Sequence, residues 1–275
     1  MSRIVWLASY PKSGNTWLRV FLANLSSDSD RPYDINTLRE FGFSDTRASL
    51  FERVSGQPFE ALSTERIHQL RPAVHRLISR QRTGLVYVKT HNAIAVRDGV
   101  PTITPEVTKG AVYLIRNPLD VAVSYAHHFA MAVDDVIVAM ASPDNVLATV
   151  ERSAFSYLGT WSQHVRSWTQ APGLNAHVVR YEDMLEGSAA TFRAVSRHLG
   201  LEVSRAELKR AVRFSSFEEL KRQESAHGFR ERGPAGNAFF RRGEAGAWQD
   251  ALQPAQAAAI IEAHREVMGA FGYLP

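Results

Sequence analysis

A loop rich in hydrogen-bond donors follows the first apolar run of the chain. Residues 4–8 (IVWLA) are typical of a buried strand, and SYPKSGNTW comes next. A loop between a strand and a helix aims several backbone N–H groups in one direction, where the helix dipole also favours negative charge. Lys12 adds a positive charge, and Ser13, Asn15 and Thr16 add side-chain donors. The pattern predicts a phosphate site, although it is not the Walker pattern, in which Lys follows a second glycine.

A histidine follows the second predicted strand. Residues 85–88 (LVYV) lead directly into Lys89, Thr90 and His91. The ends of parallel strands are where α/β enzymes place reactive groups, and an imidazole with a pKa of about 6.5 suits removal of a proton from a hydroxyl. A histidine taken at random from the 10 in this chain is more often structural. The position after a strand is what nominates His91.

An arginine and a serine flank the start of a predicted helix. Arg116 directly follows the apolar run at 111–115, and Ser124 lies eight positions later in the helical pattern at 119–129. The two side chains could converge on one phosphate from two sides. Asp120, between them, is expected to cap the helix or to pair with a neighbouring base.

These residues belong to an alternation of strands and helices. Apolar runs typical of strands occur at 4–8, 85–88, 111–115 and 177–179. Helical periodicity occurs at 65–81, 119–129, 154–169, 189–199 and 255–271. Such alternation predicts an α/β fold with a parallel sheet and helices on both faces. The segments 26–63 and 225–246 look rich in loops and are either mobile lids or ordinary surface connections.

Composition excludes several kinds of chemistry. The 275 residues are 45% hydrophobic and 22% charged, as in ordinary globular proteins, and include no Cys. Disulfides, thiolate zinc sites, iron–sulfur clusters and a cysteine nucleophile are therefore excluded. The net charge of +4 is too small to name a partner. With no signal peptide and no long apolar stretch, we expect a soluble, cytoplasmic protein whose partners include neither nucleic acid nor a membrane.

Together, these motifs resemble the cytosolic-type sulfotransferases, which use 3′-phosphoadenosine 5′-phosphosulfate (PAPS). Residues 10–17 match that family's Tyr-Pro-Lys-Ser-Gly-x-Thr-Trp loop, with Asn15 at the variable place. Residues 89–91 match the tripeptide that carries its catalytic base, and 113–125 match the string that binds its 3′-phosphate. The resemblance implies a single domain over 1–275, with a P-loop-like parallel sheet flanked by helices.

The resemblance also implies roles for the matched residues. It implies that His91 removes the acceptor proton, that Lys89 offsets charge on the sulfonate, and that Lys12 contacts the 5′-phosphate and the bridging oxygen. Arg116 and Ser124 would bind the 3′-phosphate, and Trp17 would stack on the adenine. The rest of the loop that would hold the 5′-phosphosulfate consists of Ser13, Gly14, Asn15 and Thr16.

Shorter matches nominate further contacts to the nucleotide. Tyr181, in a string like the family's Tyr-Glu-Asp turn, would contact the adenine, but a core tyrosine would look the same. Ser215 would also approach the adenine, with helix capping as the alternative. Near the C-terminus, Arg241, Arg242 and Gly243 match a segment that closes over the 3′-phosphate.

That C-terminal segment departs from the family pattern at three positions, the first being Arg242, where Lys is usual. Ala247 replaces a usual Asp, and Gln249 replaces a usual Lys, which puts the hydrogen bonding of this turn in doubt. The dimer signature of some members is also missing, so the oligomeric state stays open.

The function predicted from these motifs is sulfonate transfer from PAPS to a hydroxyl of a small molecule, leaving 3′-phosphoadenosine 5′-phosphate (PAP). One alternative is an ATP-dependent kinase with a degenerate phosphate loop, which would need a Walker lysine and an acid to hold Mg²⁺. Another is a nucleotide-binding protein without catalysis, which would be expected to have lost Lys12 or His91. The sequence retains both residues. The identity of the acceptor cannot be read from the sequence.

Turnover should survive excess EDTA. No Asp/Glu cluster suited to Mg²⁺ follows a predicted strand, and Lys12 and Lys89 can supply positive charge instead. The measurement is the steady-state rate with PAPS before and after chelation. Activity that EDTA abolishes and Mg²⁺ restores would contradict the metal-free mechanism and favour the kinase alternative.

Overall fold

Two compact units make up the computed structural model, which describes residues 3–150, 152–233 and 236–275. The first unit contains residues up to Tyr10 together with 42–113 and 139–178, and the second contains 11–41, 114–138 and 179–275. Pro234 and Ala235, within the predicted loop-rich segment 225–246, lie outside the described residues.

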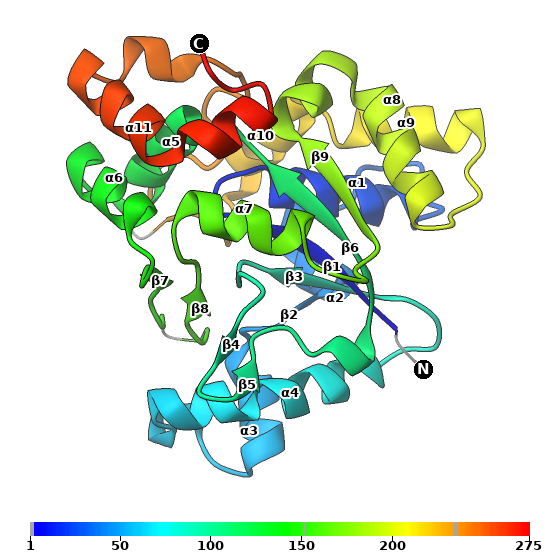
Figure 1. Ribbon diagram of the computed structural model, residues 1–275. Helices are drawn as coiled ribbons and strands as arrows, with labels where there is room; N and C mark the ends of the chain where they lie inside the picture. Colours follow the sequence, from blue (N-terminus) through cyan, green and yellow to red (C-terminus); the bar gives the residue numbers. More distant parts are fainter. Residues whose placement is uncertain (1–2, 151, 234–235) are drawn as a thin grey trace. The chain divides into compact units, whose positions relative to one another are not determined.

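A five-stranded sheet belongs almost entirely to the first unit (Figure 1). Its strand order is β2 (Phe43–Ser44), β3 (Val86–Thr90), β1 (Ile4–Ser9), β6 (Thr108–Ile115) and β9 (Ala176–Arg180). Only the last two residues of β6 and of β9 belong to the second unit. β1 and β2 both pair in parallel with β3, with Ala8 opposite Thr90 and Ser44 opposite Lys89. All residues of β1 are buried, as expected for a strand covered on both faces. The predicted α/β fold with a parallel sheet is confirmed.

Short helices and two hairpins complete the first unit. They are α3 (Ala48–Ser55), η2 (Phe59–Ala61), α4 (Thr64–Ser79), η3 (Pro105–Val107), α7 (Trp161–Thr169), the hairpin β4 (Val96–Arg97) with β5 (Val100–Pro101), and the hairpin β7 (Val146–Leu147) with β8 (Ser156–Tyr157). Helices α3 and α4 lie side by side (Figure 1). Trp6 of β1 is fully buried, donates from Nε1 to Thr108 Oγ1 at 2.9 Å, and lies edge-on to His75 of α4.

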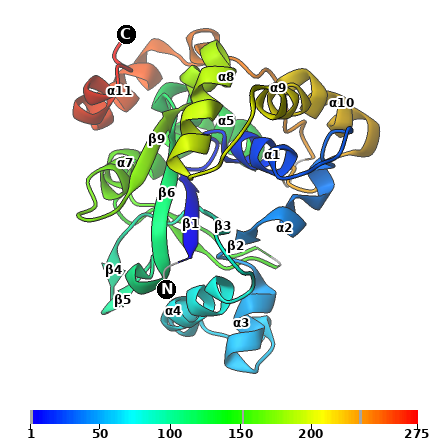
Figure 2. The same cartoon turned by 90° about the vertical axis from the view of Figure 1, so that its right-hand side faces the viewer.

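The second unit is helical. Its elements are α1 (Asn15–Leu25), η1 (Ile35–Thr37), α2 (Leu38–Phe41), α5 (Pro118–Phe129), most of α6 (Val133–Ala141), α8 (Tyr181–His198), α9 (Arg205–Phe214), α10 (Phe217–His227), η4 (Ala247–Asp250) and α11 (Pro254–Ala270). Helix α9 packs against α1 and α8 (Figure 2), and α11 packs against α5. Val20, Leu38, Leu220 and Phe240 share one apolar cluster, which joins α1, α2 and α10 to the segment after α10.

Three sequence predictions differ from the structure. The helix predicted at 154–169 begins only at Trp161, because Ser156 and Tyr157 pair with β7 instead. The segment 26–63 is not mainly loop, since it contains α2, β2 and α3. Strand β3 continues to Thr90 through its pairing with β1, so Lys89 lies within the strand and only His91 follows it. The described residues between α10 and η4 contain no helix or strand.

No single helix in the described part of the chain has the length and apolar character needed to cross a membrane. Helices α5 and α6 have that length and composition only when taken together, and they are bent by 120° relative to each other.

The free energy of unfolding should fall as the pH drops from about 6.5 toward 5. Burial lowers the pKa of His75 to about 3 and of His164 and His264 to about 4, so the folded protein keeps them neutral while the unfolded chain protonates them. Each contributes a slope that rises toward about 1.4 kcal/mol per pH unit at the acid end of this window. Urea titrations at several pH values measure the slope.

A matched pair of variants checks that assignment. His264→Leu should reduce the slope by the share of one histidine, because His264 is buried in α11. His227→Gln, at an exposed position, should leave the slope unchanged. Equal slopes in all three proteins would show that other groups cause the acid sensitivity.

Candidate functional site

The loop after β1 presents a helix N-terminus. Lys12 and Gly14 both adopt left-handed backbone conformations, with φ of 70° and 97°, and α1 begins directly afterwards. Gly14 precedes the helix and has no side chain to cap it. A Cβ on Gly14 would lie 2.8 Å from the ring of Tyr181, so the close approach requires glycine. The Ser13 hydroxyl is buried and has no hydrogen-bond partner among the described residues.

Four basic side chains of the second unit, those of Lys12, Arg116, Arg241 and Arg242, lie within electrostatic range of Arg241 or of its neighbour His127. Arg116 directly follows β6, as predicted, and donates to Lys12 O and to Glu244 O, both at 3.2 Å. Burial lowers the pKa of Arg241, and the positive charges of Arg242 and Arg116 lower it further. Arg116 Nε is buried without a partner within the described residues. Such a gathering of like charges favours an anion that would offset them.

Two of these basic residues also lower the pKa of His127 in α5. Burial is the main cause that lowers its pKa, and Arg241 and Lys12 lower it further. Because both cations act on one imidazole, the positive charge extends from the phosphate loop to the C-terminal segment. The cationic group of Lys12, Arg116, Arg241 and Arg242 can therefore hold a multiply charged anion such as a phosphorylated nucleotide.

Asp120 has a role that the sequence did not predict. Asn117, not Asp120, caps α5 by accepting from Leu119 N at 3.0 Å. The buried Asp120 carboxylate instead accepts from Gly246 N at 2.8 Å and from Trp248 N at 3.0 Å. The expectation that it caps the helix or pairs with a base is wrong, because its side chain reaches another segment. These two hydrogen bonds also stabilise the turn at Trp248, although Ala247 stands where the family usually has Asp.

The nominated aromatic side chains pack within the second unit. Tyr181 is the first residue of α8, and Arg116 Cζ lies 4.2 Å from its ring centroid. Trp17 lies edge-on to Tyr181 at 6.0 Å between centroids, and edge-on to Phe192. The buried position of Tyr181 fits the core alternative, and its contact with Arg116 also places it beside the cationic group. A role for Trp17 or Tyr181 on adenine stays a prediction.

Two nominated serines differ in their surroundings. Ser124 is half-buried in α5, eight positions after Arg116 as the spacing required. Ser215 is fully buried and donates to Ala211 O at 2.8 Å, at the end of α9. The Ser215 hydroxyl therefore donates its hydrogen bond within the end of α9, as the capping alternative predicts. An approach of its oxygen to adenine stays a prediction.

The segment after α10 is fastened at several points. Glu231 forms two hydrogen bonds with Arg19 of α1, at 2.7 and 3.0 Å, and accepts from Thr16 Oγ1 at 3.3 Å. Glu224 accepts from the backbone N–H groups of Phe239 and Phe240. These acids were missed because nothing in the local sequence pairs them with groups so far along the chain.

Two contacts near the basic residues depend on phenylalanine rings. Phe239 lies under the Lys12 ammonium, with 4.0 Å from Nζ to the ring centroid. Gly243 has a φ of 65°, and a Cβ there would meet the Phe217 ring within 2.6 Å. The predicted glycine is thus required by this close approach, whatever ligand is bound.

His91 of the first unit has an oriented imidazole. Its Nδ1 lies 2.8 Å from Ser9 O, and a carbonyl oxygen can only accept, so the neutral ring carries its hydrogen on Nδ1. Nε2 is then the basic nitrogen that can take a proton. Lys89 lies two residues earlier, half-buried in β3. The roles of His91 as a base and of Lys89 as a positive charge stay predictions.

Comparisons with known proteins agree on one family. Residues 2–272 match the family described as the sulfotransferase domain. Sulfotransferase 1A1 of Canis lupus familiaris is 27% identical over 260 residues, which cover 91% of this chain and 78% of that protein.

Two solved structures have a similar fold. Mouse sulfotransferase SULT7A1 complexed with PAP aligns over 96% of this chain and 84% of its own, with a TM-score of 0.60 and 20% identity. Retinol dehydratase in a complex with retinol and PAP aligns over 96% and 81%, with a TM-score of 0.64 and 20% identity.

Arg116→Ala should weaken PAP binding by roughly tenfold to a hundredfold. A charge-assisted hydrogen bond contributes about 1.5–3 kcal/mol, and each 1.4 kcal/mol is a factor of ten in affinity. AMP, which carries a 3′-hydroxyl in place of the phosphate, should lose little affinity. Arg116→Lys, which keeps the charge but not the planar fork, should fall between. Equal losses for PAP and AMP by calorimetry at fixed salt would assign Arg116 to the fold or to the 5′ end.

Proposed function

The chain belongs to the sulfotransferase domain family, and from that premise we propose which of its residues bind PAPS and which deprotonate the acceptor. Sulfonate transfer from PAPS is the activity of this family. The residue assignment rests on the geometry of the cationic group and of His91. The kinase alternative has no support from the comparisons.

The convergence of Lys12, Arg116, Arg241 and Arg242 is the observation that carries the assignment of the cofactor site. PAPS bears negative charge on its 3′-phosphate and on its 5′-phosphosulfate, so a site for it needs a separate positive group for each. Arg116, Ser124, Arg241, Arg242 and Gly243 are assigned to the 3′-phosphate. Lys12 and the loop residues Ser13, Gly14, Asn15 and Thr16 are assigned to the 5′-phosphosulfate. Trp17, Tyr181 and Ser215 are assigned to the adenosine.

The residues present fit this ligand on two counts. Ser13 Oγ and Arg116 Nε are buried polar atoms without partners among the described residues, and burial of such groups is costly unless something bonds them. The first turn of α1 adds backbone donors and the positive end of its dipole. No group of three or more metal-ligating side chains occurs within the described ranges, so the charge in the site is assigned to lysine and arginine.

His91 acts as the general base in the proposed mechanism. Its Nδ1–H bond to Ser9 O fixes the ring, and Nε2 accepts the hydroxyl proton of the acceptor. Bound PAPS supplies a sulfonate whose bond to the phosphate oxygen breaks as the acceptor oxygen bonds to sulfur. Lys89 offsets the charge on that sulfonate, and Lys12 offsets the charge left on the phosphate. Positioning and charge stabilisation therefore account for the rate enhancement.

The acceptor is proposed to be a hydroxyl of a small molecule. A base of the histidine type suits a hydroxyl, and the structural neighbour that holds retinol, an alcohol, supports the same class. A cytoplasmic location is proposed as well, and a chain without Cys, which needs no disulfides, is compatible with a reducing compartment. A screen of hydroxylated metabolites, phenols and glycosylated natural products with PAPS would identify the acceptor.

His91→Ala should lower kcat by roughly 10²- to 10⁴-fold, the usual loss for a general base. The affinity for PAP should barely change, because the base serves the acceptor rather than the nucleotide. Turnover with an acceptor from the screen and calorimetry with PAP provide the two measurements. A variant that keeps near wild-type kcat would show that another group deprotonates the acceptor.

A further inference from the structure

The turn that carries His91 is held at almost every backbone carbonyl. Lys89 O accepts from Asp45 N at 3.3 Å, and His91 O lies 3.0 Å from His164 Nε2. Asn92 O accepts from Trp168 Nε1 at 2.9 Å, and Ala93 O accepts from the Thr102 hydroxyl at 2.6 Å. The donors come from parts of the first unit far apart in the sequence. A segment fixed in this way has little freedom to change its direction.

One buried carboxylate holds the two residues on either side of His91. Asp45 is fully buried, and its Oδ2 accepts from Thr90 Oγ1 and from Asn92 Nδ2, both at 2.8 Å. Thr90 Oγ1 in turn accepts from Asn92 N at 3.0 Å. Asn92 Oδ1 accepts from Tyr157 N at 2.9 Å. The backbone of His91 is therefore bracketed by a closed ring of hydrogen bonds centred on Asp45.

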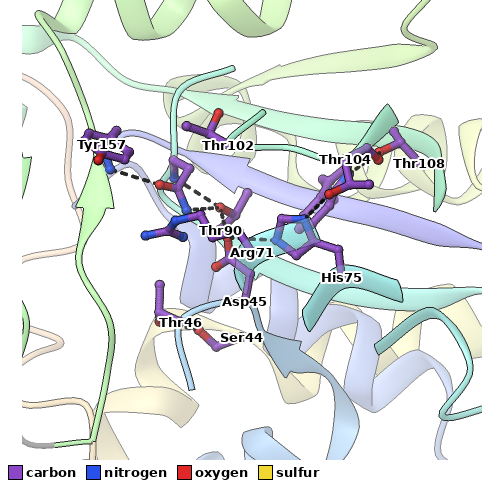
Figure 3. A network of polar contacts seen from close by, with 12 residues as sticks. Ser44, Asp45, Thr46, Arg71, His75, Thr90, Thr102, Thr104, Thr108 and Tyr157 are labelled. Carbon is purple, nitrogen blue, oxygen red and sulfur yellow. Dashed lines mark hydrogen bonds and ion pairs between the residues drawn. The ribbon is translucent and has the colours of Figure 1, made fainter. Parts of the chain in front are cut away.

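Burial of the Asp45 carboxyl group costs free energy. Burial raises the pKa of Asp45, which the Arg71 positive charge and the bonds from Thr90 and Asn92 oppose. Arg71 is itself buried, donates to Phe155 O and lies over the Phe155 ring. Figure 3 shows Arg71, Thr90 and His75 gathered around Asp45. Asp45 Oδ1 and two nitrogens of Arg71 are buried without a partner among the described residues, so this acid and base are expensive to place and a packing role alone explains them poorly.

We propose that Asp45 is a positioning residue for the His91 base: through Thr90 and Asn92 it fixes the turn so that His91 Nδ1 stays bonded to Ser9 O and Nε2 faces the acceptor. The inference rests on the proposed role of His91. It adds that the direction of the imidazole is set by a carboxylate that touches neither the imidazole nor the nucleotide. Misplacement of a reacting group by about 1 Å can lower the rate a hundredfold, so loss of the hydrogen bonds between Asp45 and the His91 turn should have a measurable effect.

Two isosteric substitutions separate positioning from general stability. Thr90→Val removes the hydroxyl that bonds Asp45, with little change in shape. Thr104→Val is its matched control, because Thr104 is equally buried and lies 2.8 Å from Nδ1 of His75, whose Nε2 is 3.9 Å from Asp45 Oδ2, and it forms no bond to the His91 turn in the described part of the chain. Thr90→Ser restores the hydroxyl. Both valine variants should lose stability, measured by urea unfolding.

Of the two valine variants, only Thr90→Val should lose turnover. We expect Thr90→Val to lower kcat by roughly tenfold to a hundredfold with unchanged PAP affinity, Thr90→Ser to recover most of it, and Thr104→Val to stay within a few-fold of wild type. In a His91→Ala background, Thr90→Val should lower the residual rate no further. Equal kcat losses for the two valine variants, or additive losses in the double variant, would overturn the positioning role.

A spectroscopic readout on the PAP-bound protein needs no acceptor. Nitrogen-15 imidazole spectra should show His91 in wild type as the Nδ1–H tautomer alone, a mixture of tautomers in Thr90→Val, and the wild-type pattern in Thr104→Val. An unchanged tautomer in Thr90→Val would overturn the inference while leaving the proposed function intact. Near wild-type kcat in His91→Ala would overturn the proposed base itself, whatever the tautomer shows.

Discussion

Repulsion between Arg241 and its neighbours Arg242 and Arg116 is a constraint that the second unit has to offset. Positive groups do not gather unless other bonds hold them, and here those bonds come from backbone carbonyls and acids. Arg116 is tied to Lys12 O and Glu244 O, and Asp120 fastens the turn that ends at Trp248. An anion that binds here as proposed would meet side chains already held in place, so little of the binding free energy would be spent on ordering them.

The first unit uses neutral groups for a different purpose. Burial lowers the pKa of His164 to about 4, so its ring is neutral when it bonds both His91 O and the Tyr113 hydroxyl. The carbonyls of Lys89, His91, Asn92 and Ala93 are thus occupied by donors of the first unit, which fixes the backbone that carries the proposed base. A base needs an exact direction more than it needs a strong field, whereas a nucleotide with several charges needs the field.

The sequence predicted the contacts that lie close together along the chain. The Gly14 loop, the Arg116 to Ser124 spacing and the strand that leads to His91 are local patterns, and their expected elements were found. The acids that hold the site were not predicted. Glu231 bonds Thr16 across 215 positions, and Asp45 bonds Thr90 across 45, so no periodicity or motif connects them. Asp120 was assigned to its own helix for the same reason.

Sequence alone determined the family of this protein, because an ordered set of short motifs matches the sulfotransferase domain, and it predicted a phosphate loop, a strand-end base and paired groups for a second phosphate. It also determined the alternation of strands and helices, since side-chain periodicity is a local property. Tertiary structure decided which nitrogen of His91 is basic, which acid holds which backbone group, and how strongly the arginines perturb one another. Those properties depend on distances between segments remote in the chain, and such distances exist only once the chain has folded.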